Sequence, residues 1–199
     1  SVEQGVGAGA TFLTDNPQWQ IQDTVGNLDR TMSTHLDFTF GDVRDYVASV
    51  ADHMLATFDL DGIELCFRDR AYFPEGTERE RQPLMTEFVR AVRQIVLKAG
   101  DIKGRKLTLG ARVYATLDLC HAQGLDVETW VKDGLIDYVS PGDIMYTSIN
   151  EPLDEFGELT RNTECMLYPG MLPHSSARRI RFLEGQPINL DQMRAAANN

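Results

Sequence analysis

The segment that most constrains the fold is 58–68, whose sequence is Phe-Asp-Leu-Asp-Gly-Ile-Glu-Leu-Cys-Phe-Arg. Its second half alternates between apolar residues and residues with charged or reactive side chains, as a β-strand with two different faces does. The apolar set is Ile63, Leu65 and Phe67, and the other set is Glu64, Cys66 and Arg68. Amphipathic stretches precede and follow this strand. That order predicts repeated β/α units, in which chemistry collects at the carboxyl ends of the strands.

Further strand-like and helix-like segments alternate along the chain, which predicts an α/β fold with a parallel sheet. We expect one domain over 1–199, because no internal repeat, low-complexity linker or boundary signal interrupts the pattern. The additional strands are expected at 36–40, 107–114, 135–140 and 165–167. Helices are expected from Asp42 to Phe58, from Pro83 to Gly100, from Asp126 to Asp133, from Pro152, and from Asn189 to Ala197.

The charge of the chain limits its partners. The formal net charge is −11, which disfavours nucleic acid and anionic membranes, because both bind cationic surfaces. No apolar run approaches the roughly 20 residues of a membrane-spanning helix. Three cysteines lack the spacing of a metal site, and the compartment stays open, a secreted or periplasmic protein without its signal being one alternative.

Several motifs resemble those of the glycoside-hydrolase-like TIM-barrel proteins of bacteria often called glycosyl-hydrolase-like family 10. The resemblance covers roughly 15–198, and it depends on the order and spacing of the motifs more than on any one of them. The motifs are Pro17-Gln18-Trp19, Leu36-Asp37-Phe38, Asp42–Val47, Asp59–Leu65, Gly124–Val131, Gly134–Asp137 and Leu167–Gly170.

The chain departs from the family pattern in two ways. The pattern at the central strand is Asp-Gly-Ile-Glu-Leu-Asp-Phe, and Cys66 stands where its second aspartate would be. The matching region begins at about the second or third barrel strand and stops just before the eighth. A full barrel has eight units and about 250 residues. The resemblance therefore implies an incomplete or shortened (β/α) barrel.

Glu64 is the first candidate for catalysis. The central strand would be the fourth strand of such a barrel, where many sugar-cleaving barrels carry their acid, so Glu64 resembles that general acid/base. Glycoside hydrolysis needs a second carboxylate across the scissile bond, and Asp143 and Asp37 are the candidates for it. The alternative for Glu64 is a structural ion pair with Arg68 or Arg112.

Other residues could hold a sugar. Arg68 and Arg112 present guanidinium groups that bind carboxylates and hydroxyls in fixed geometry. Aromatic residues in loops or at strand ends could stack on sugar rings, although each could equally pack in the core. These aromatic candidates are Tyr72, Tyr114, Tyr146 and Tyr168.

The sequence therefore predicts a glycoside-hydrolase-like protein that acts on a carbohydrate, with no cofactor and no metal. A non-catalytic carbohydrate-binding or scaffold module on a degenerate barrel is the main alternative, and a metal-dependent sugar isomerase is a third. An incomplete barrel would leave sheet edges unpaired. We expect such edges to cause self-association or low stability in solution.

Overall fold

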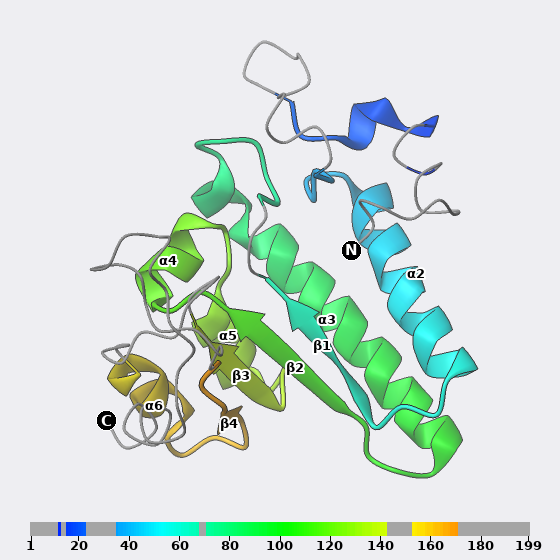
Figure 1. Cartoon of the computed structure of the whole chain (residues 1–199), viewed down its shortest axis with the longest axis vertical. Helices are drawn as coiled ribbons and strands as arrows, with labels where there is room; N and C mark the ends of the chain where they lie inside the picture. Colours follow the sequence, from blue (N-terminus) through cyan, green and yellow to red (C-terminus); the bar gives the residue numbers. More distant parts are fainter. Residues whose placement is uncertain (1–11, 13–14, 23–34, 68–70, 143–152, 171–199) are drawn as a thin grey trace, which may run out of the picture.

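The computed structural model describes residue 12 and residues 15–22, 35–67, 71–142 and 153–170 of the 199-residue chain. Four parallel strands form one sheet in the order β1-β2-β3-β4 (Figure 1). Helices lie between successive strands in the chain. The fold class is thus α/β with a parallel sheet, as the sequence predicted, and the arrangement is that of part of a (β/α) barrel. The strands are β1 (Gly62–Cys66), β2 (Thr108–Val113), β3 (Tyr138–Pro141) and β4 (Met166–Leu167).

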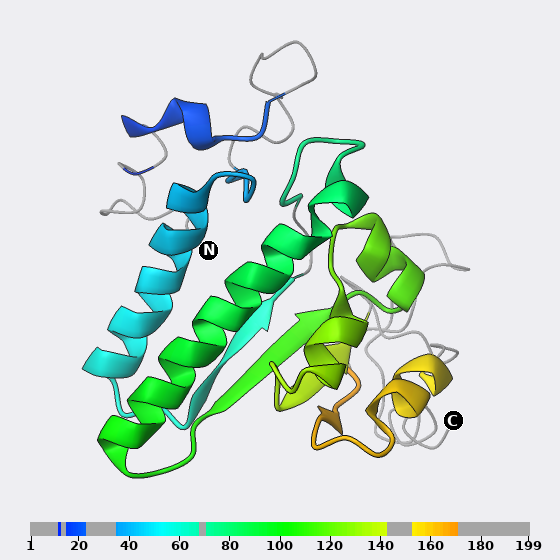
Figure 2. The ribbon, with the colours of Figure 1, turned by 180° about the vertical axis from the view of Figure 1, so that it is seen from behind.

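One face of the sheet is covered by helices. Seen from behind, α3 (Glu78–Lys103) and α5 (Val127–Lys132) lie in front of the strands, and α2 (Gly41–Thr57) lies alongside α3 (Figure 2). The strand residues on this face are apolar, and those of β2 and β3 are fully buried. They belong to one core with the inward side of α3, which removes their apolar surface from water. The strand residues concerned are Ile63, Leu65, Leu109, Ala111, Val113 and Val139.

The opposite face of the sheet, here called the inner face, carries the other alternating set. On β1 this set is Gly62, Glu64 and Cys66, and on β2 it is Thr108, Gly110 and Arg112. Tyr138 and Ser140 continue the inner face on β3. Within β1, the alternation therefore predicted correctly that Glu64 and Cys66 share a face, while Arg68 lies outside the described residues.

The expected strand at 36–40 is wrong. Leu36 makes a single antiparallel bridge with Gln20, and residues 38–40 form a turn that leads into α2. The amide of Phe38 bonds instead to the carbonyl of Tyr72, in the loop after β1. Backbone groups that other loops already satisfy are not available to a strand ladder. Helix α2 also begins at Gly41, one residue before the predicted cap at Asp42.

The buried side of α2 differs from the predicted one. The helical spacing of apolar residues in the sequence predicts a buried stripe that includes Val50, Met54 and Phe58, and all three are exposed. The helix packs against α3 and buries smaller residues instead. The buried residues of α2 are Val43, Ala48, Ala51 and Leu55. Small side chains let two helices approach closely, so α2 faces α3 with its alanines.

Helix α3 is longer than predicted at both ends. It begins at Glu78 rather than near Pro83, and it ends at Lys103, where Gly104 takes a left-handed conformation with φ of 66°. Gly100, the predicted end, is inside the helix. A side-chain carbon there would lie 2.8 Å from the carbonyl oxygen of Arg105. Gly100 is therefore required by the close return of the chain, and Gly104 by the turn.

Three shorter helices complete the described part. Helix α4 (Leu117–Ala122) lies where the sequence indicated an irregular segment, and α6 is Asp154–Thr160. Asp126 caps α5 as predicted, because its carboxylate accepts a hydrogen bond from the amide of Thr129. A 3₁₀ turn covers Pro17–Trp19. In this part of the chain no helix is both long and apolar enough to cross a membrane.

Candidate functional site

The inner face places three residues in one row across the sheet. Glu64 on β1 is the register partner of Gly110 on β2, and Gly110 is the partner of Tyr138 on β3. Because Gly110 has no side chain, the Tyr138 side chain can cross over β2. Its hydroxyl donates a hydrogen bond to Oε2 of Glu64 at 3.2 Å. A side chain from the third strand thus holds an acid on the first.

Arg112 approaches the same carboxylate from the next row. Its Nε lies 2.8 Å from Oε1 of Glu64, which makes an ion pair, although the Nε–H is not aligned with an acceptor as in a hydrogen bond. The side chains of Arg112 and Glu64 are 36% and 26% exposed. The pair is therefore accessible, and its strength is reduced by solvent. Of the alternatives left open by the sequence, the structure places Arg112 beside Glu64.

The surroundings of Tyr138 raise the pKa of its phenol. Burial raises the pKa of Tyr138, and the negative charge of Glu64 and the hydrogen bond to it raise this pKa further. Arg112 acts in the opposite direction, and Tyr168 adds a smaller increase. Tyr138 therefore keeps its proton over a wide pH range, and its hydroxyl remains a donor toward Glu64.

Tyr168 extends the cluster at β4. Its ring lies 5.5 Å from that of Tyr138 in an edge-to-face arrangement, and the Tyr168 side of the pair is exposed. Its hydroxyl lies 3.1 Å from the sulfur of Met166. An exposed aromatic ring near an acid and a guanidinium is a surface on which a sugar could stack. The structure thus brings together three predicted residues, which are Glu64, Arg112 and Tyr168.

Asp37 does not join this group. It is 6% exposed, and its Oδ1 accepts a hydrogen bond from the amide of Thr39 at 2.8 Å. That bond holds the turn before α2 and gives Asp37 a structural explanation. The placement does not support Asp37 as the second carboxylate.

Two of the predicted aromatic residues lie toward the core. Tyr72 is 6% exposed, and its ring packs edge-on against the rings of Phe38 and Phe67. Tyr114 follows β2, is half-buried and packs against the core, and its carbonyl accepts a weak hydrogen bond from the thiol of Cys120. The roles of both residues as sugar contacts stay predictions. The other predicted site residues, Arg68, Asp143 and Tyr146, lie outside the described residues.

Tyr138 and Gly110 were not predicted as site residues. Each belongs to an expected strand, and a glycine within a strand marks a place where another group approaches closely. That signal was present at Gly110. The identity of the approaching group depends on the register of three strands, which the sequence does not specify.

The described residues contain no group of three His, Cys, Asp or Glu side chains placed to hold a metal ion. Cys66 is a free thiol at the exposed end of β1. The other two cysteines are buried, and burial raises the pKa of Cys120 to about 12 and that of Cys165 to about 11. Thiols with such pKa values are poor nucleophiles near neutral pH.

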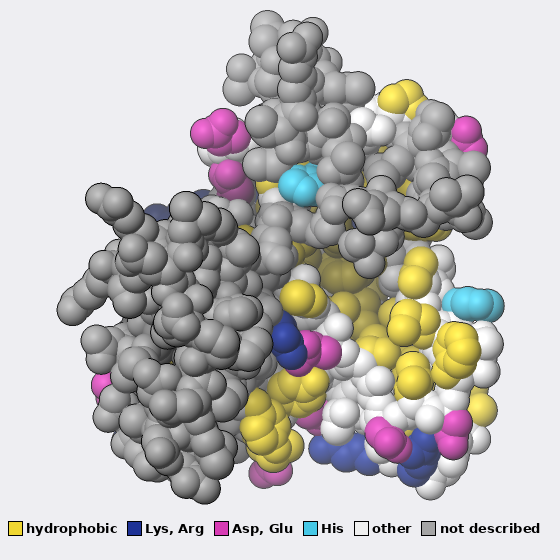
Figure 3. Space-filling model, viewed as in Figure 1, with side chains coloured by type: hydrophobic (Ala, Val, Ile, Leu, Met, Phe, Trp, Pro, Cys, Tyr) yellow, Lys and Arg dark blue, Asp and Glu magenta, His cyan; other side chains and the backbone are white. Residues whose placement is uncertain are grey.

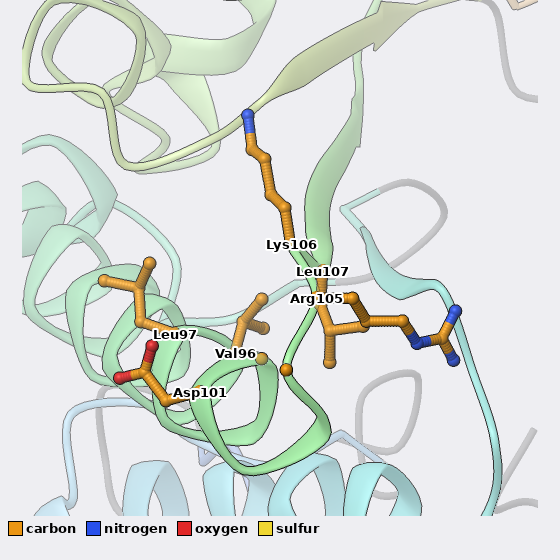
Figure 4. A pocket seen from close by; sticks show the side chains of 8 residues that line it. Val96, Leu97, Asp101, Arg105, Lys106 and Leu107 are labelled. Atoms are coloured by element: carbon orange, nitrogen blue, oxygen red, sulfur yellow. The ribbon is translucent and has the colours of Figure 1, made fainter.

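A cavity of about 470 Å³ lies at the other end of β2, next to the last turns of α3 (Figure 4). Val96, Leu97 and Asp101 line it from the helix. Arg105 and Lys106 also line it, and both form ion pairs with carboxylates of neighbouring segments. This cavity is at the amino end of the strand, whereas parallel β/α folds carry their chemistry at the carboxyl end. We do not include it in the site.

No protein-family model matches the chain, and no curated protein matches it. The resemblance to glycosyl-hydrolase-like family 10 therefore stays a prediction. The solved structures, in contrast, include similar folds.

One similar structure is a protein of Bacillus subtilis assigned as a sporulation-specific glycosylase. The identity is 11%, the TM-score is 0.53, and the match covers 85% of this chain and 58% of that one. Another is a glycoside hydrolase family 18 N-acetylglucosaminidase from Paenibacillus barengoltzii, with 18% identity and a TM-score of 0.42 over 53% of this chain and 30% of that one. The chain thus spans less than two thirds of either structure. At such identities the similarity concerns the fold alone.

Proposed function

We propose that this protein is glycosidase-like and acts on a carbohydrate, with Glu64 as general acid/base. The observation that carries the proposal is the fixed and accessible carboxylate of Glu64 on the inner face. Among the described strand residues of that face, Glu64 is the only acid. The similarity of fold between this chain and the Bacillus subtilis protein is in accord with this function.

The neighbours of Glu64 favour one direction of proton transfer. Tyr138 donates to the carboxylate, and Arg112 offers it a positive charge. Both interactions suit a carboxylate that accepts a proton from a reacting group. Glu64 would take a proton from an attacking water or a sugar hydroxyl and could return it later in the cycle. Arg112 and the exposed ring of Tyr168 would contact the sugar.

The charge of the chain narrows the ligand. A formal net charge of −11 repels polyanions, so a neutral or amino-bearing glycan fits better than an acidic one. The roles predicted for Arg68, Tyr72, Tyr114 and Tyr146 stay predictions. Asp143 and Asp37 both stay candidates for the second carboxylate.

A non-catalytic carbohydrate-binding module is the second candidate function. One specific observation favours it: Cys66, in register with Arg112, occupies the inner-face position where the resembled family has an aspartate. Hydrolysis generally uses two carboxylates, and binding needs neither of them as a proton carrier.

The test compares wild type with Glu64→Gln on a panel of neutral and amino-bearing polysaccharides. Binding is followed by affinity electrophoresis and cleavage by the release of reducing ends. Loss of general acid–base catalysis should lower turnover about 10²- to 10⁴-fold while binding persists. The control is Glu87→Gln, which removes an exposed glutamate of α3.

Each outcome distinguishes the candidates. Glycan binding by wild type without product release would favour the binding module. Equal turnover of wild type and Glu64→Gln would remove the role assigned to Glu64. Absence of both binding and cleavage across the panel would contradict a carbohydrate ligand.

A further inference from the structure

The ring of Tyr138 lies over Gly110 on its way to Glu64. Three distances define how the ring is oriented. A carbon placed at the missing Cβ of Gly110 would lie 2.0 Å from Cζ of Tyr138 and 2.4 Å from each Cε atom. A point in the plane of the ring beyond Cζ would be clearly farther from the two Cε atoms. The equal, short pair places that point above the ring. The flat face of Tyr138 therefore covers Gly110.

Any side chain at position 110 would displace the ring. Non-bonded carbon atoms approach to about 3.5–4.0 Å, so even alanine would need the ring to move by more than one ångström. The ring of Tyr168, which directly follows β4, also contacts the Tyr138 ring, with the ring centroids 5.5 Å apart. Gly110 thus determines whether the hydroxyl of Tyr138 can reach β1.

The two oxygens of Glu64 have different surroundings. Oε2 accepts the hydrogen bond of Tyr138, while Oε1 has the charge of Arg112 beside it but no aligned hydrogen bond from Nε. A carboxylate oxygen can accept more than one hydrogen bond. Oε1 therefore retains accepting capacity, and the Glu64 side chain is partly exposed.

We propose that Tyr138 is a positioning residue, which holds Oε2 of Glu64 so that Oε1 is directed to the ligand, and that Gly110 is the residue that permits this. The proposal depends on the function proposed above only in that Glu64 is the reacting group. The hydrogen bond restricts rotation of the carboxylate, and preorganisation of this kind lets a reactive group meet its substrate in the productive orientation.

The experiment uses the full chain with ¹³Cζ-labelled tyrosine, titrated from about pH 8 to about pH 12 by NMR, a range that brackets the ordinary tyrosine pKa. The Tyr138 signal is the one absent from Tyr138→Phe. Tyr46→Phe is the matched control, because it removes a tyrosine hydroxyl on α2, where the ring stacks on Phe12 and not on Tyr138.

In wild type we expect Tyr138 to titrate above the ordinary tyrosine range, because burial and Glu64 both raise its pKa. In Glu64→Gln the midpoint should fall, since the negative charge is lost. Burial and Tyr168 would still raise the pKa of Tyr138, and Arg112 would still lower it, but the increase due to the negative charge of Glu64 would be lost. Gly110→Ala should also change the Tyr138 signal. An unchanged Tyr138 midpoint in Glu64→Gln would overturn the proposal.

A functional readout separates this proposal from the previous one. Tyr138→Phe keeps the ring over Gly110 but removes the hydroxyl. It should lower turnover about tenfold to hundredfold with little change in KM, because a misoriented catalytic group lowers the rate by about this factor. It should also shift the pH profile, whereas Tyr46→Phe, on α2, should not shift it. If Glu64→Gln abolishes cleavage and Tyr138→Phe leaves both kcat and the pH profile unchanged, positioning is wrong and the proposed function stands. If wild type neither binds nor cleaves glycans, the proposed function fails, and the titration still decides whether Tyr138 orients Glu64.

Discussion

Arg93 and Asp137 join α3 to the segment that leads into β3, with Nη1 of Arg93 lying 2.6 Å from Oδ2 of Asp137. Asp137 also accepts a hydrogen bond from the amide of Leu109, and Lys106 lies 3.1 Å from its other oxygen. Burial alone would raise the pKa of Asp137, but these three donors, Arg93 foremost, hold it below its ordinary value. The carboxylate therefore connects one helix and two strands.

The first prediction is that Asp137→Asn destabilises the fold. Asp137 and Arg93 are 8% and 14% exposed, so the substitution leaves a poorly solvated guanidinium without its partner. Removing one partner of a buried pair costs about 3–5 kcal/mol, and the accessible Lys106 suggests the lower end of that range. Urea unfolding measures it. Asp133→Asn is the control. The Arg90–Asp133 pair joins α3 to the end of α5, is 46% exposed on both sides and should contribute less than about 1 kcal/mol.

The difference in stability between wild type and Asp137→Asn should depend on pH in a defined direction. A carboxylate whose pKa is lowered by folding contributes its full stability above its unfolded pKa of about 3.9, and loses it as the pH falls toward the folded value. The gap between wild type and Asp137→Asn should therefore be constant near neutral pH and become smaller below about pH 4. A gap of equal size at all pH values would contradict the assigned ion pair.

The sequence predicted the inner face well because alternation is a local property. Glu64 and Arg112 share that face because each alternates with the apolar residues of its own strand, which pack on the helix side of the sheet. The same reasoning could not find Tyr138 as the partner of Glu64. Their contact depends on the relative register of β1, β2 and β3.

The errors in the helices have a common physical cause. Periodicity predicts that an apolar stripe exists but not which neighbour it meets. It therefore predicts Val50 and Met54 as buried, whereas the buried residues include Ala48 and Ala51. Similarly, composition cannot distinguish a glycine that ends a helix from one that lets the chain return. Gly104 and Gly100 have these two roles, respectively.

The second prediction contrasts two helical glycines. Gly100→Ala should destabilise the protein by about 1–3 kcal/mol, because the new carbon would meet the carbonyl oxygen of Arg105 at 2.8 Å and the backbone would have to shift. Gly157→Ala, in α6, has open space around it and should stabilise by about 0.5–1 kcal/mol through its higher helix propensity. Thermal unfolding of both variants measures this. Equal effects of the two substitutions would show that helix propensity, not the close approach of Arg105, determines the change in stability at position 100.

The third prediction concerns a buried hydrogen bond. The indole Nε1 of Trp130 donates to the hydroxyl of Thr86 at 3.0 Å, and Trp130 has no exposed surface. Thr86→Val keeps the shape but removes the acceptor, so the indole donor is left unsatisfied at a cost of about 1–3 kcal/mol. Urea unfolding is the measurement, and Thr57→Val, on the exposed side of α2, should change stability by less than about 0.5 kcal/mol. A similar small effect for Thr86→Val would mean that water or another group replaces the acceptor.

The fourth prediction is self-association through the β1 edge. Among the described strands, β1 has a neighbour on one side only, and alternate backbone groups of β1 point to its other side. Exposed apolar residues of α2 lie beside this edge, and Figure 3 shows hydrophobic side chains gathered over α2 and next to β1. An unpaired strand beside an apolar surface favours association. The residues are Val50, Met54 and Phe58.

We expect the mass measured by light scattering to rise with protein concentration. Since the net charge of −11 opposes association, high salt should strengthen it by screening the repulsion. Met54→Glu adds a charge to the apolar surface and should shift the protein toward the monomer. Leu119→Glu, which changes a similarly exposed residue on α4, should have little effect. A stable wild-type monomer with the same mass at every concentration and salt level would exclude association through this edge.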